Sequence, residues 1–385
     1  MTMDRHCEEP QATRQSRAGA NRPGLLRFAH NDDGPVESSS AFPASERGAE
    51  SSSAFPARER GAALLTVLLL VAVMAVVSAA AVERLTLATR LAGSASAMEQ
   101  ARHFAMAGEA LALRRIDTLL AANDSQVTLD GGWHGRTFTL PLPGGSAEMR
   151  LTDGGNCFNI NSLVATSQAG ESGGMAPPRP LAIQQFTALL QGLGTDRATA
   201  DRIVAGAVDW IDADQSAMPN GAEDSTYAAA SPARRTADRP MASAGELAQI
   251  AGMTPALAQR LSRWTCALPT DDLSPINVNT LLPEQAVLLQ MLTGNRISPA
   301  QARTALAARP SGGYGSVNRF WADPALGGMA PPGDAASQVR LTTRWFRLET
   351  NVRLGDVTLG SSALIDAGEQ GQRARVVRRS WGSEG

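Results

Sequence analysis

Five carboxylates lie close together within sixteen residues near the middle of the chain. They flank a Pro-Asn-Gly turn and are Asp209, Asp212, Asp214, Glu223 and Asp224. Hard cations such as calcium take about six to eight oxygen ligands, many of them carboxylates and carbonyls of one or two loops. The spacing differs from that of the EF-hand loop. The cluster therefore fits either a cation site or a solvated acidic loop that follows a helix.

Two cysteines form a second candidate group. Besides Cys7, the chain contains Cys157 and Cys266, so an even pair remains if residues 1–61 are removed. In an oxidising compartment a bridge between them would close a loop of about 110 residues and stabilise the fold by roughly 4–5 kcal/mol in the loop-entropy description. Two buried free thiols are the alternative.

No catalytic set is evident in the sequence. The histidines are His6, His30, His103 and His134, and none has the spacing of a metal site. All 35 basic residues are arginine, which excludes a phosphate-binding glycine loop with its lysine. The net charge of −2 gives no general argument for a nucleic-acid or anionic-lipid partner. We therefore predict that the protein is not an enzyme.

Two segments resemble the hairpins of helix-hairpin-helix proteins. They are Leu247–Thr254 and Ile276–Thr280, each followed by a predicted helix. Such hairpins bind phosphate through backbone amides, and a DNA binder surrounds them with basic residues. Only a few arginines lie nearby, namely Arg260, Arg263, Arg296, Arg303 and Arg309. We therefore favour a packing role, and a membrane-anchored DNA receptor of the competence type is the alternative function.

These groups follow a long predicted helix. Residues 62–82 carry no charge, and a helix of this length spans about 31 Å, close to the thickness of a bilayer core. Arg58 and Arg60 precede it, which places the N-terminus in the cytoplasm and everything after Val82 outside it. The apolar pattern continues on one face to Ala122. We predict one helix over residues 62–122, with its transmembrane part at 62–82.

The first 61 residues do not have the pattern of a folded domain. They are rich in Arg, Ser and Pro, and they contain a 13-residue unit that begins at Glu37 and again at Glu50. Such a composition buries too little apolar surface to offset the entropy of ordering. Residues 1–61 are predicted to be a disordered leader, of which 1–57 are either functional or translated from a start codon assigned too early.

The remaining sequence predicts an α+β fold. Alternating residues predict strands at Arg136–Leu140, Ala147–Thr152, Arg344–Leu354, Val357–Ile365 and Ala374–Ser380. The stretch between the two strand sets is mainly helical, which indicates a small antiparallel sheet on the long helix with a large helical domain inserted between strands. The predicted division is sheet at 123–162, helical insertion at 163–275, second helical segment at 276–340 and C-terminal strands at 341–385.

The beginning of the helix resembles a prepilin peptidase site. Arg-Glu-Arg-Gly61 followed by Ala62-Ala63-Leu64-Leu65 is similar to the site in type IV pilins and type II secretion pseudopilins. The resemblance implies cleavage after Gly61 and N-methylation of Ala62. Most members carry glutamate at the fifth mature position, where this chain has Thr66, and this departure resembles the minor pseudopilin K family. A buried glutamate would pair with the N-terminus of a neighbouring subunit, so its absence implies a subunit with nothing above it.

The resemblance to the minor pseudopilin K family covers residues 58–382. Its local markers, significant by their order, are Asn156–Leu163, Asp209–Asp214, Gly221–Tyr227 and Ile276–Thr280. It implies a non-catalytic subunit at the tip of a type II secretion pseudopilus, which initiates or caps assembly for protein export across the outer membrane. The implied partners are prepilin peptidase and the minor pseudopilins of the I, J and H types, with no nucleic acid.

The resemblance also bears on location and on both candidate groups. It implies a single pass through the bacterial inner membrane, with a periplasmic C-terminal domain. It favours calcium as a structural ion held by Asp212, Asp214, Glu223 and Asp224. Because the periplasm is oxidising, we expect Cys157 and Cys266 to form a disulfide.

Overall fold

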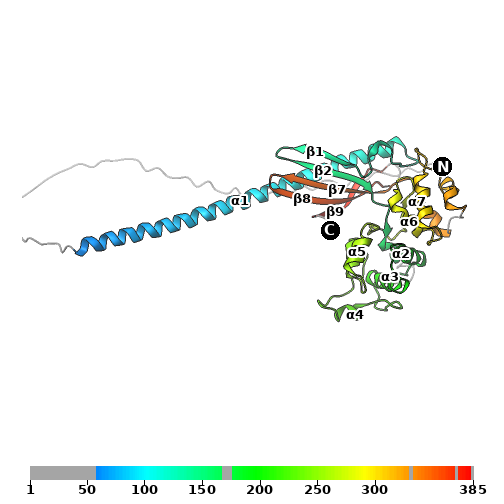
Figure 1. Ribbon diagram of the computed structural model, residues 1–385, viewed down its shortest axis with the longest axis horizontal. Coiled ribbons are helices and arrows are strands. Elements are labelled where there is room, and N and C mark those ends of the chain that lie inside the picture. Colours follow the sequence, from blue (N-terminus) through cyan, green and yellow to red (C-terminus); the bar gives the residue numbers. More distant parts are fainter. Residues whose placement is uncertain (1–57, 167–175, 329–332, 369–371, 383–385) are drawn as a thin grey trace, which may run out of the picture. The chain divides into compact units, whose positions relative to one another are not determined.

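The computed structural model describes residues 58–166, 176–328, 333–368 and 372–382. The leader of residues 1–57 and its repeat lie outside the described part. The described part begins with α1, a continuous helix over Arg58–Ala122 (Figure 1). It contains a stretch of mean hydropathy 2.8 with no buried residue, which is long and apolar enough to cross a membrane. The helix ends where the Asn123 side chain accepts hydrogen bonds from the amides of Ser125 and Gln126.

Five antiparallel strands form one sheet in the order β1-β2-β7-β8-β9 (Figure 1). Their bounds are Thr137–Leu142, Gly145–Asp153, Trp345–Leu354, Val357–Asp366 and Arg375–Trp381. All five strands were predicted from the sequence, and each predicted start and each predicted end lies within two residues of the observed one. At the β1–β2 turn a side chain at Gly145 would lie 1.8 Å from the Arg353 carbonyl oxygen, so this close approach of strands requires glycine.

Residues 154–344 are inserted between β2 and β7, which are neighbours in the sheet. The α-helices of this insertion are α2 Pro180–Gly192, α3 Arg197–Ile211, α4 Asp224–Ala228, α5 Pro255–Leu261, α6 Ala286–Leu292, α7 Pro299–Ala307 and α8 Val317–Trp321. Two short parallel pairs join distant segments: β3 Phe158–Asn159 with β4 Thr265–Cys266, and β5 Ile276–Asn277 with β6 Val339–Arg340. The predicted α+β architecture is confirmed.

The C-terminal half of α1 packs on one face of the sheet through small side chains. Ala101 and Ala105 join a cluster with Ala147 and Val352, whereas Ala112 and Ile116 join one with Leu151, Phe346 and Ile365. Between them, a side chain at Gly108 would lie 2.7 Å from the Met149 sulfur. The helix therefore lies close to the sheet because its contact face is mostly alanine and glycine, with Ile116 as a larger buried side chain near its end.

Two polar contacts fasten the last strand to this helix. The buried Glu109 carboxylate of α1 forms a bidentate ion pair with Arg379 of β9. Eight residues further along α1, Asp117 accepts a hydrogen bond of 3.0 Å from the Ala374 amide. Because β9 is an edge strand, it pairs with only one strand, β8. The two contacts with α1 supply part of the stabilisation that a second neighbouring strand would give.

A single apolar cluster forms the core of the insertion. It includes residues from both of the sequence-defined segments, 163–275 and 276–340, among them Phe186, Ile203 and Leu289. The rings of Phe158 and Phe186 stack with centroids 4.8 Å apart. Helices α2 and α6, one from each segment, make close contact within this core.

The disulfide between Cys157 and Cys266 lies where the insertion meets the sheet. The two Cα atoms are 5.8 Å apart, and the bridge spans 109 residues. Both cysteines are buried with Leu268 and with Trp345, the first residue of β7. The expected bridge is therefore formed, and it closes the first half of the insertion at its base.

Buried asparagines connect segments that are distant in the sequence. The Asn277 side chain donates to the Val127 carbonyl and to the Thr343 hydroxyl and accepts from the Asn279 amide. Asn156 in turn accepts from the Asn277 amide and donates to the Thr280 hydroxyl. Together they join the segment after α1, the end of β2, the insertion and the segment before β7.

Asn159 and Asn161 act in the same way inside the insertion. The Asn159 side chain donates from Nδ2 to the carbonyls of Thr270 and Asp272, at 2.8 and 2.9 Å. The Asn161 side chain donates to the Met241 carbonyl and accepts from the Met241 amide. All four asparagines are fully or almost fully buried. The marker sequences Asn156–Leu163 and Ile276–Thr280 are therefore hydrogen-bonding segments of the scaffold.

Replacing Asn277 with alanine tests this network. The substitution removes the buried donor to the Val127 carbonyl and the Thr343 hydroxyl and the acceptor of the Asn279 backbone amide, so the free energy of unfolding is expected to fall by about 2–4 kcal/mol. Unfolding of the detergent-solubilised protein, followed by tryptophan fluorescence, measures the change. The control is Asn318→Ala, at an exposed position on α8, which is expected to change it by less than about 0.5 kcal/mol. Equal effects of the two substitutions would contradict the role of the network.

Candidate functional site

The candidate site begins at the C-terminal end of α3. The Asp196 side chain caps the other end of this helix by accepting from the Thr199 amide at 2.9 Å. Asp209 in the last turn is fully buried and accepts from the amides of Met218 and Ala222, at 3.0 and 2.7 Å. Asp209 therefore folds the following loop back against α3 and acts as its scaffold.

Glycine is required at the point where this loop passes Asp209. A side chain at Gly221 would lie 1.9 Å from a carboxylate oxygen of Asp209. The preceding Asn220 has a φ of 69°, which asparagine tolerates better than most residues. The predicted Pro-Asn-Gly turn thus brings the second half of the acidic cluster to the first.

Three of the predicted ligands meet in this loop. One carboxylate oxygen of each of Asp212, Asp214 and Glu223 lies within 4.8 Å of the other two. Asp212 and Glu223 are each only 5% exposed. Among the described residues, one oxygen of Asp212 and both oxygens of Glu223 are buried without a hydrogen-bond partner. Buried carboxylate oxygens normally have a partner, so these three are suited to a ligand.

The electrostatics of the group are unfavourable without a cation. Burial, with the negative charge of Asp214 next, raises the pKa of Asp212 to about 7. Burial raises the pKa of Glu223 to about 7 as well, with further contributions from the charges of Asp209 and Asp212. A hard cation would remove this repulsion and provide the missing partner, and three converging carboxylates are the donor type that it prefers.

The fourth predicted ligand has a different set of contacts. Asp224 accepts hydrogen bonds from the amide and the hydroxyl of Thr236, both at 2.9 Å. The Thr236 hydroxyl also contacts Asp238 at 2.6 Å. Asp224 thus anchors the segment that carries Asp238, whose charge contributes to the raised pKa of Asp212 and Glu223. Asp238 lies outside the acidic stretch of the sequence and was not among the predicted ligands, because only the fold brings it near.

The two hairpin segments use most of their arginines internally. Arg260 donates to the Leu193 carbonyl, Arg296 to the Thr293 carbonyl, and Arg309 to the carbonyls of Val278 and Leu281. Residues 244–249, which overlap the start of the first segment, form a 3-10 helix, and the helix α5 that follows the segment has seven residues. These contacts favour packing over phosphate binding.

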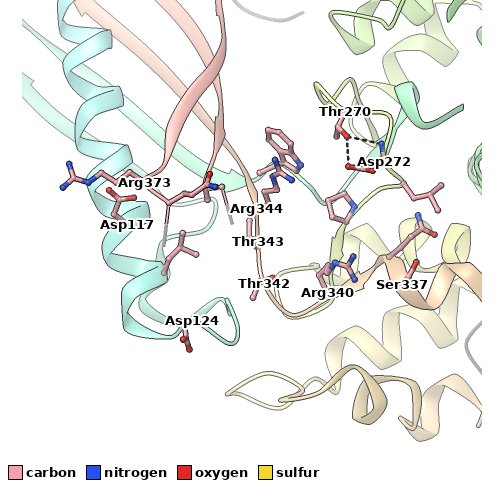
Figure 2. Close-up of a pocket in the computed structure, with 18 of the residues that line it drawn as sticks. Asp117, Asp124, Thr270, Asp272, Ser337, Arg340, Thr342, Thr343, Arg344 and Arg373 are labelled. Atoms are coloured by element: carbon pink, nitrogen blue, oxygen red, sulfur yellow. Dashed lines mark hydrogen bonds between the residues drawn. The ribbon is translucent and has the colours of Figure 1, made fainter. Parts of the chain in front are cut away.

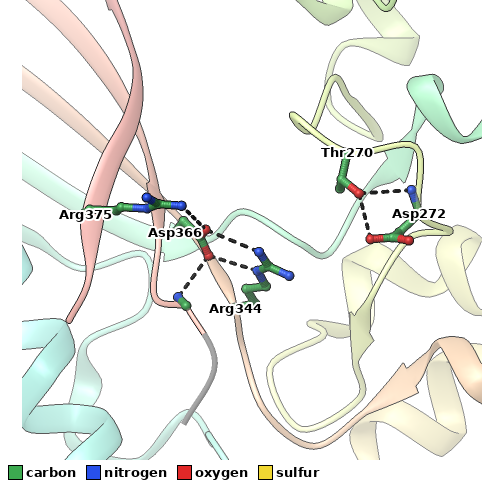
Figure 3. Close-up of polar contacts among 6 residues, drawn as sticks. Thr270, Asp272, Arg344, Asp366 and Arg375 are labelled. Atoms are coloured by element: carbon green, nitrogen blue, oxygen red, sulfur yellow. Dashed lines mark hydrogen bonds and ion pairs between the residues drawn. The ribbon is translucent and has the colours of Figure 1, made fainter. Parts of the chain in front are cut away.

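A cavity of about 1220 Å³ lies away from the acidic cluster (Figure 2). It is lined by residues of α1, of the 270–275 loop and of the segment before β7. At its side Arg344 holds the buried Asp366 at 2.9 Å, and Arg375 lies 3.6 Å away (Figure 3). Burial acts to raise the pKa of Asp366, but the hydrogen bond and charge of Arg344 lower it below its usual value. These structural ion pairs join the end of β8 to Arg344, the residue before β7, and to Arg375, the first residue of β9.

The histidines of the described part are not grouped for catalysis. His103 is exposed on α1. His134 is next to Trp133, and burial and the charge of Arg150 lower its pKa to about 4. His134 is therefore neutral at physiological pH and is part of the packing beside the sheet.

The residues implied in processing lie in the exposed N-terminal part of α1. A side chain at Gly61 would meet nothing within 4 Å, so packing does not require glycine there. Ala62 is also exposed. The Thr66 hydroxyl donates to the Ala63 carbonyl at 2.9 Å and is thus satisfied within the helix.

Comparison with known proteins gives consistent matches. Two family models described as Type II secretion system (T2SS), protein K match residues 156–270 and 276–344. Type II secretion system protein K of Klebsiella pneumoniae is 34% identical over 322 residues, which cover 83% of this chain and 95% of the relative. The protein of the same description from Pseudomonas aeruginosa is 31% identical over 337 residues, covering 84% and 93%.

A solved structure agrees with the sequence matches. A chain of the GspK-GspI-GspJ complex from the enterotoxigenic Escherichia coli Type 2 Secretion System superposes with a TM-score of 0.63 at 30% identity. The match covers 74% of this chain and 96% of that one. Together with the long apolar helix, the sheet and the inserted helical domain, these matches show that the chain belongs to the type II secretion system protein K family.

Proposed function

We propose that this protein is a minor pseudopilin at the tip of a type II secretion pseudopilus, where it initiates or caps assembly without catalysing a reaction. The observation that carries the proposal is the position of the insertion. It leaves the sheet after Asp153 and returns at Trp345, next to the contacts of Ala112 and Ile116 near the C-terminal end of α1. A subunit stacked on that end would meet the insertion, so the fibre cannot continue past it.

Thr66 supports the same position. In a filament, a carboxylate at this place would pair with the charged N-terminus of the adjacent subunit within the membrane. The Thr66 hydroxyl is instead satisfied by its own helix. A subunit with no neighbour above it has no N-terminus to neutralise.

The proposed topology follows from α1. Its apolar stretch would cross the inner membrane once, with the arginines before Gly61 on the cytoplasmic side and the sheet and insertion in the periplasm. Prepilin peptidase would cleave after Gly61 and methylate Ala62. The disulfide agrees with an oxidising compartment.

The proposed partners are the other minor pseudopilins. The similar chain from enterotoxigenic Escherichia coli was solved in complex with GspI and GspJ. By this likeness the present chain would assemble with subunits of the I and J types and, through the same fibre, with the H type. A competence-type DNA receptor is not favoured, because the arginines near the hairpins hold backbone carbonyls.

We also propose calcium as a structural ion at the acidic loop. Asp212, Asp214 and Glu223 would hold it, with Asp224 supporting the neighbouring segment. When bound, the ion would neutralise the repulsion between the carboxylates and fasten the loop to the end of α3. Such binding stabilises only the folded chain.

Processing is tested by the mass of the mature protein. In cells with prepilin peptidase, we expect an N-terminal peptide that begins with methylated Ala62. Gly61→Val is expected to leave the chain unprocessed. Gly93→Val is the matched control, because that glycine lies in the same helix and also has no neighbour within 4 Å. An intact Met1, or a cut beyond Val82, would overturn the assignment.

The tip position is tested by labelling fibres. With an epitope placed in the insertion and the major pseudopilin overproduced, immunogold label is expected at one end of each pseudopilus. Deletion of the gene is expected to reduce export and fibre initiation. Label distributed along the fibre would show a repeating subunit and contradict the proposal.

Calcium binding is tested by its dependence on pH. Because the folded-state pKa of Asp212 and Glu223 is raised to about 7, the calcium-free fold loses stability as pH rises toward and through about 7. Calcium binds the deprotonated carboxylates, so we expect it to raise the melting temperature by several degrees at pH 8 and by much less at pH 5.5.

The Asp212→Asn/Glu223→Gln double variant should melt at the same temperature with calcium or with EDTA. Asp201→Asn, which removes an exposed helical ion pair to Arg197, should keep the calcium response. A response that is the same at both pH values, or that survives in the double variant, would argue against this site.

A further inference from the structure

A second cavity, of about 920 Å³, lies on the face of the sheet that α1 does not cover. Leu151 of β2, Leu348 of β7 and Ala363 of β8 pack in the cluster with α1. Because adjacent residues of a strand point to opposite faces, their neighbours point away from α1. These neighbours all line the cavity, which we call the sheet-face cavity, and are Arg150, Thr152, Arg347, Glu349, Ser362 and Leu364.

The insertion forms the other wall of the sheet-face cavity. Two of its loops, residues 242–245 and 262–268, border the cavity. In the second loop Arg263 is exposed, and Trp264 next to it is partly buried. This wall therefore offers a cation and an aromatic ring side by side.

Two contacts hold the walls together. The Cys157–Cys266 disulfide lines the cavity, and Leu364 of the sheet packs against it. Arg378 of β9 reaches the insertion, where it donates to the Ala267 carbonyl at 2.6 Å. The cavity is therefore formed before any ligand enters it, as is usual for binding sites.

Arginine dominates the charge of the sheet-face cavity. Its four arginines, three on the sheet wall and the last on the insertion wall, are Arg150, Arg347, Arg378 and Arg263. Among the described lining residues the acidic ones are Glu349, which pairs with Arg150 at 2.6 Å, and Asp153. Burial raises the pKa of Asp153, which favours its neutral form. Because the whole chain has a net charge of −2, this excess of positive charge is local.

The arginines of the sheet wall are spaced like alternate side chains of an extended peptide. Arg347 and Arg378 lie in one row on either side of Leu364, so their Cα atoms are about 10 Å apart. Arg347 pairs with Thr152, which places Arg150 diagonally across from it at about 7–8 Å. Alternate residues of an extended peptide are about 7 Å apart. Such spacing suits several carboxylates along a chain better than one phosphate group, which requires converging arginines.

We propose that the sheet-face cavity binds an extended acidic peptide segment of another protein. Arginine forms bidentate hydrogen bonds with carboxylates, so alternate acidic side chains of the peptide would bind along the sheet wall. Arg263 and Trp264 on the opposite wall are of the residue types that contribute most to protein interfaces, and the ring supplies an apolar contact. The cavity faces away from α1, and the inference does not depend on the proposed tip position.

Fluorescence anisotropy with the detergent-solubilised full chain tests this inference. The probe is a labelled peptide of about six residues in which glutamate alternates with leucine, long enough to extend along the sheet wall. We expect saturable binding that weakens about tenfold or more when salt is raised, because salt screens the charges. The same peptide with glutamine in place of glutamate is expected not to bind. Equal binding of the two peptides, or equally tight competition by an oligosaccharide of the same negative charge, would overturn the inference.

Charge substitutions locate the binding. Arg263→Glu is expected to weaken binding of the glutamate peptide about tenfold or more, whereas Glu349→Gln, which removes a negative charge from the cavity, is expected to strengthen it about threefold. Arg303→Glu is the matched control: it changes the net charge equally at an exposed position of α7 outside the cavity, and it should leave the affinity unchanged. The melting temperatures should all agree, because the three side chains are largely exposed. Equal affinities of the Arg263→Glu and Arg303→Glu variants would contradict binding in this cavity.

Discussion

The position of the insertion depends on side-chain amides buried where it joins the sheet. Asn156 and Asn277 bond to each other and to the segments that follow α1 and precede β7. Beside them Asp153 accepts from the Thr280 hydroxyl at 2.6 Å and from Thr343, and burial raises its pKa in spite of these bonds. Each of these buried polar groups costs free energy if it is left without a hydrogen-bond partner. They therefore favour the one arrangement of the sheet and the insertion in which all of them are paired. The disulfide lies in the same place and adds a covalent limit.

Much of the fold could be predicted because its elements have strong periodicity. The long helix, the five strands and the main helices of the insertion follow from apolar spacing and from proline and glycine positions. Helices α4 and α8, of five residues each, and the two-residue pairs β3–β4 and β5–β6 could not be predicted. Such short elements exist because tertiary contacts hold them, and their sequences carry too few residues to show a period.

The candidate site was predictable in part for the same reason. The density of carboxylates identified Asp212, Asp214 and Glu223, but the separate roles of Asp209 and Asp224 as hydrogen-bond acceptors for the backbone depend on loop geometry. Asp238 contributes charge from outside the stretch. The buried asparagines can likewise be read in the sequence. Their function in connecting distant segments depends on which carbonyls they face in the fold. Composition indicates the type of chemistry, and the fold decides which residue performs it.

The distribution of surface polarity divides the molecule into two parts with different tasks. In its described residues the insertion buries its large apolar side chains in one core and leaves a polar exterior. Beyond the apolar stretch of α1, the described residues of the pilin-like half instead expose four such side chains, two on α1 and two on the edge strands β1 and β9. A polar end and an apolar side agree with the proposed terminal position, in which a subunit binds neighbours along its helix and offers no surface for another on top. The junction of buried amides keeps these two surfaces in fixed relation, so the block to growth that we propose for the insertion depends on that junction.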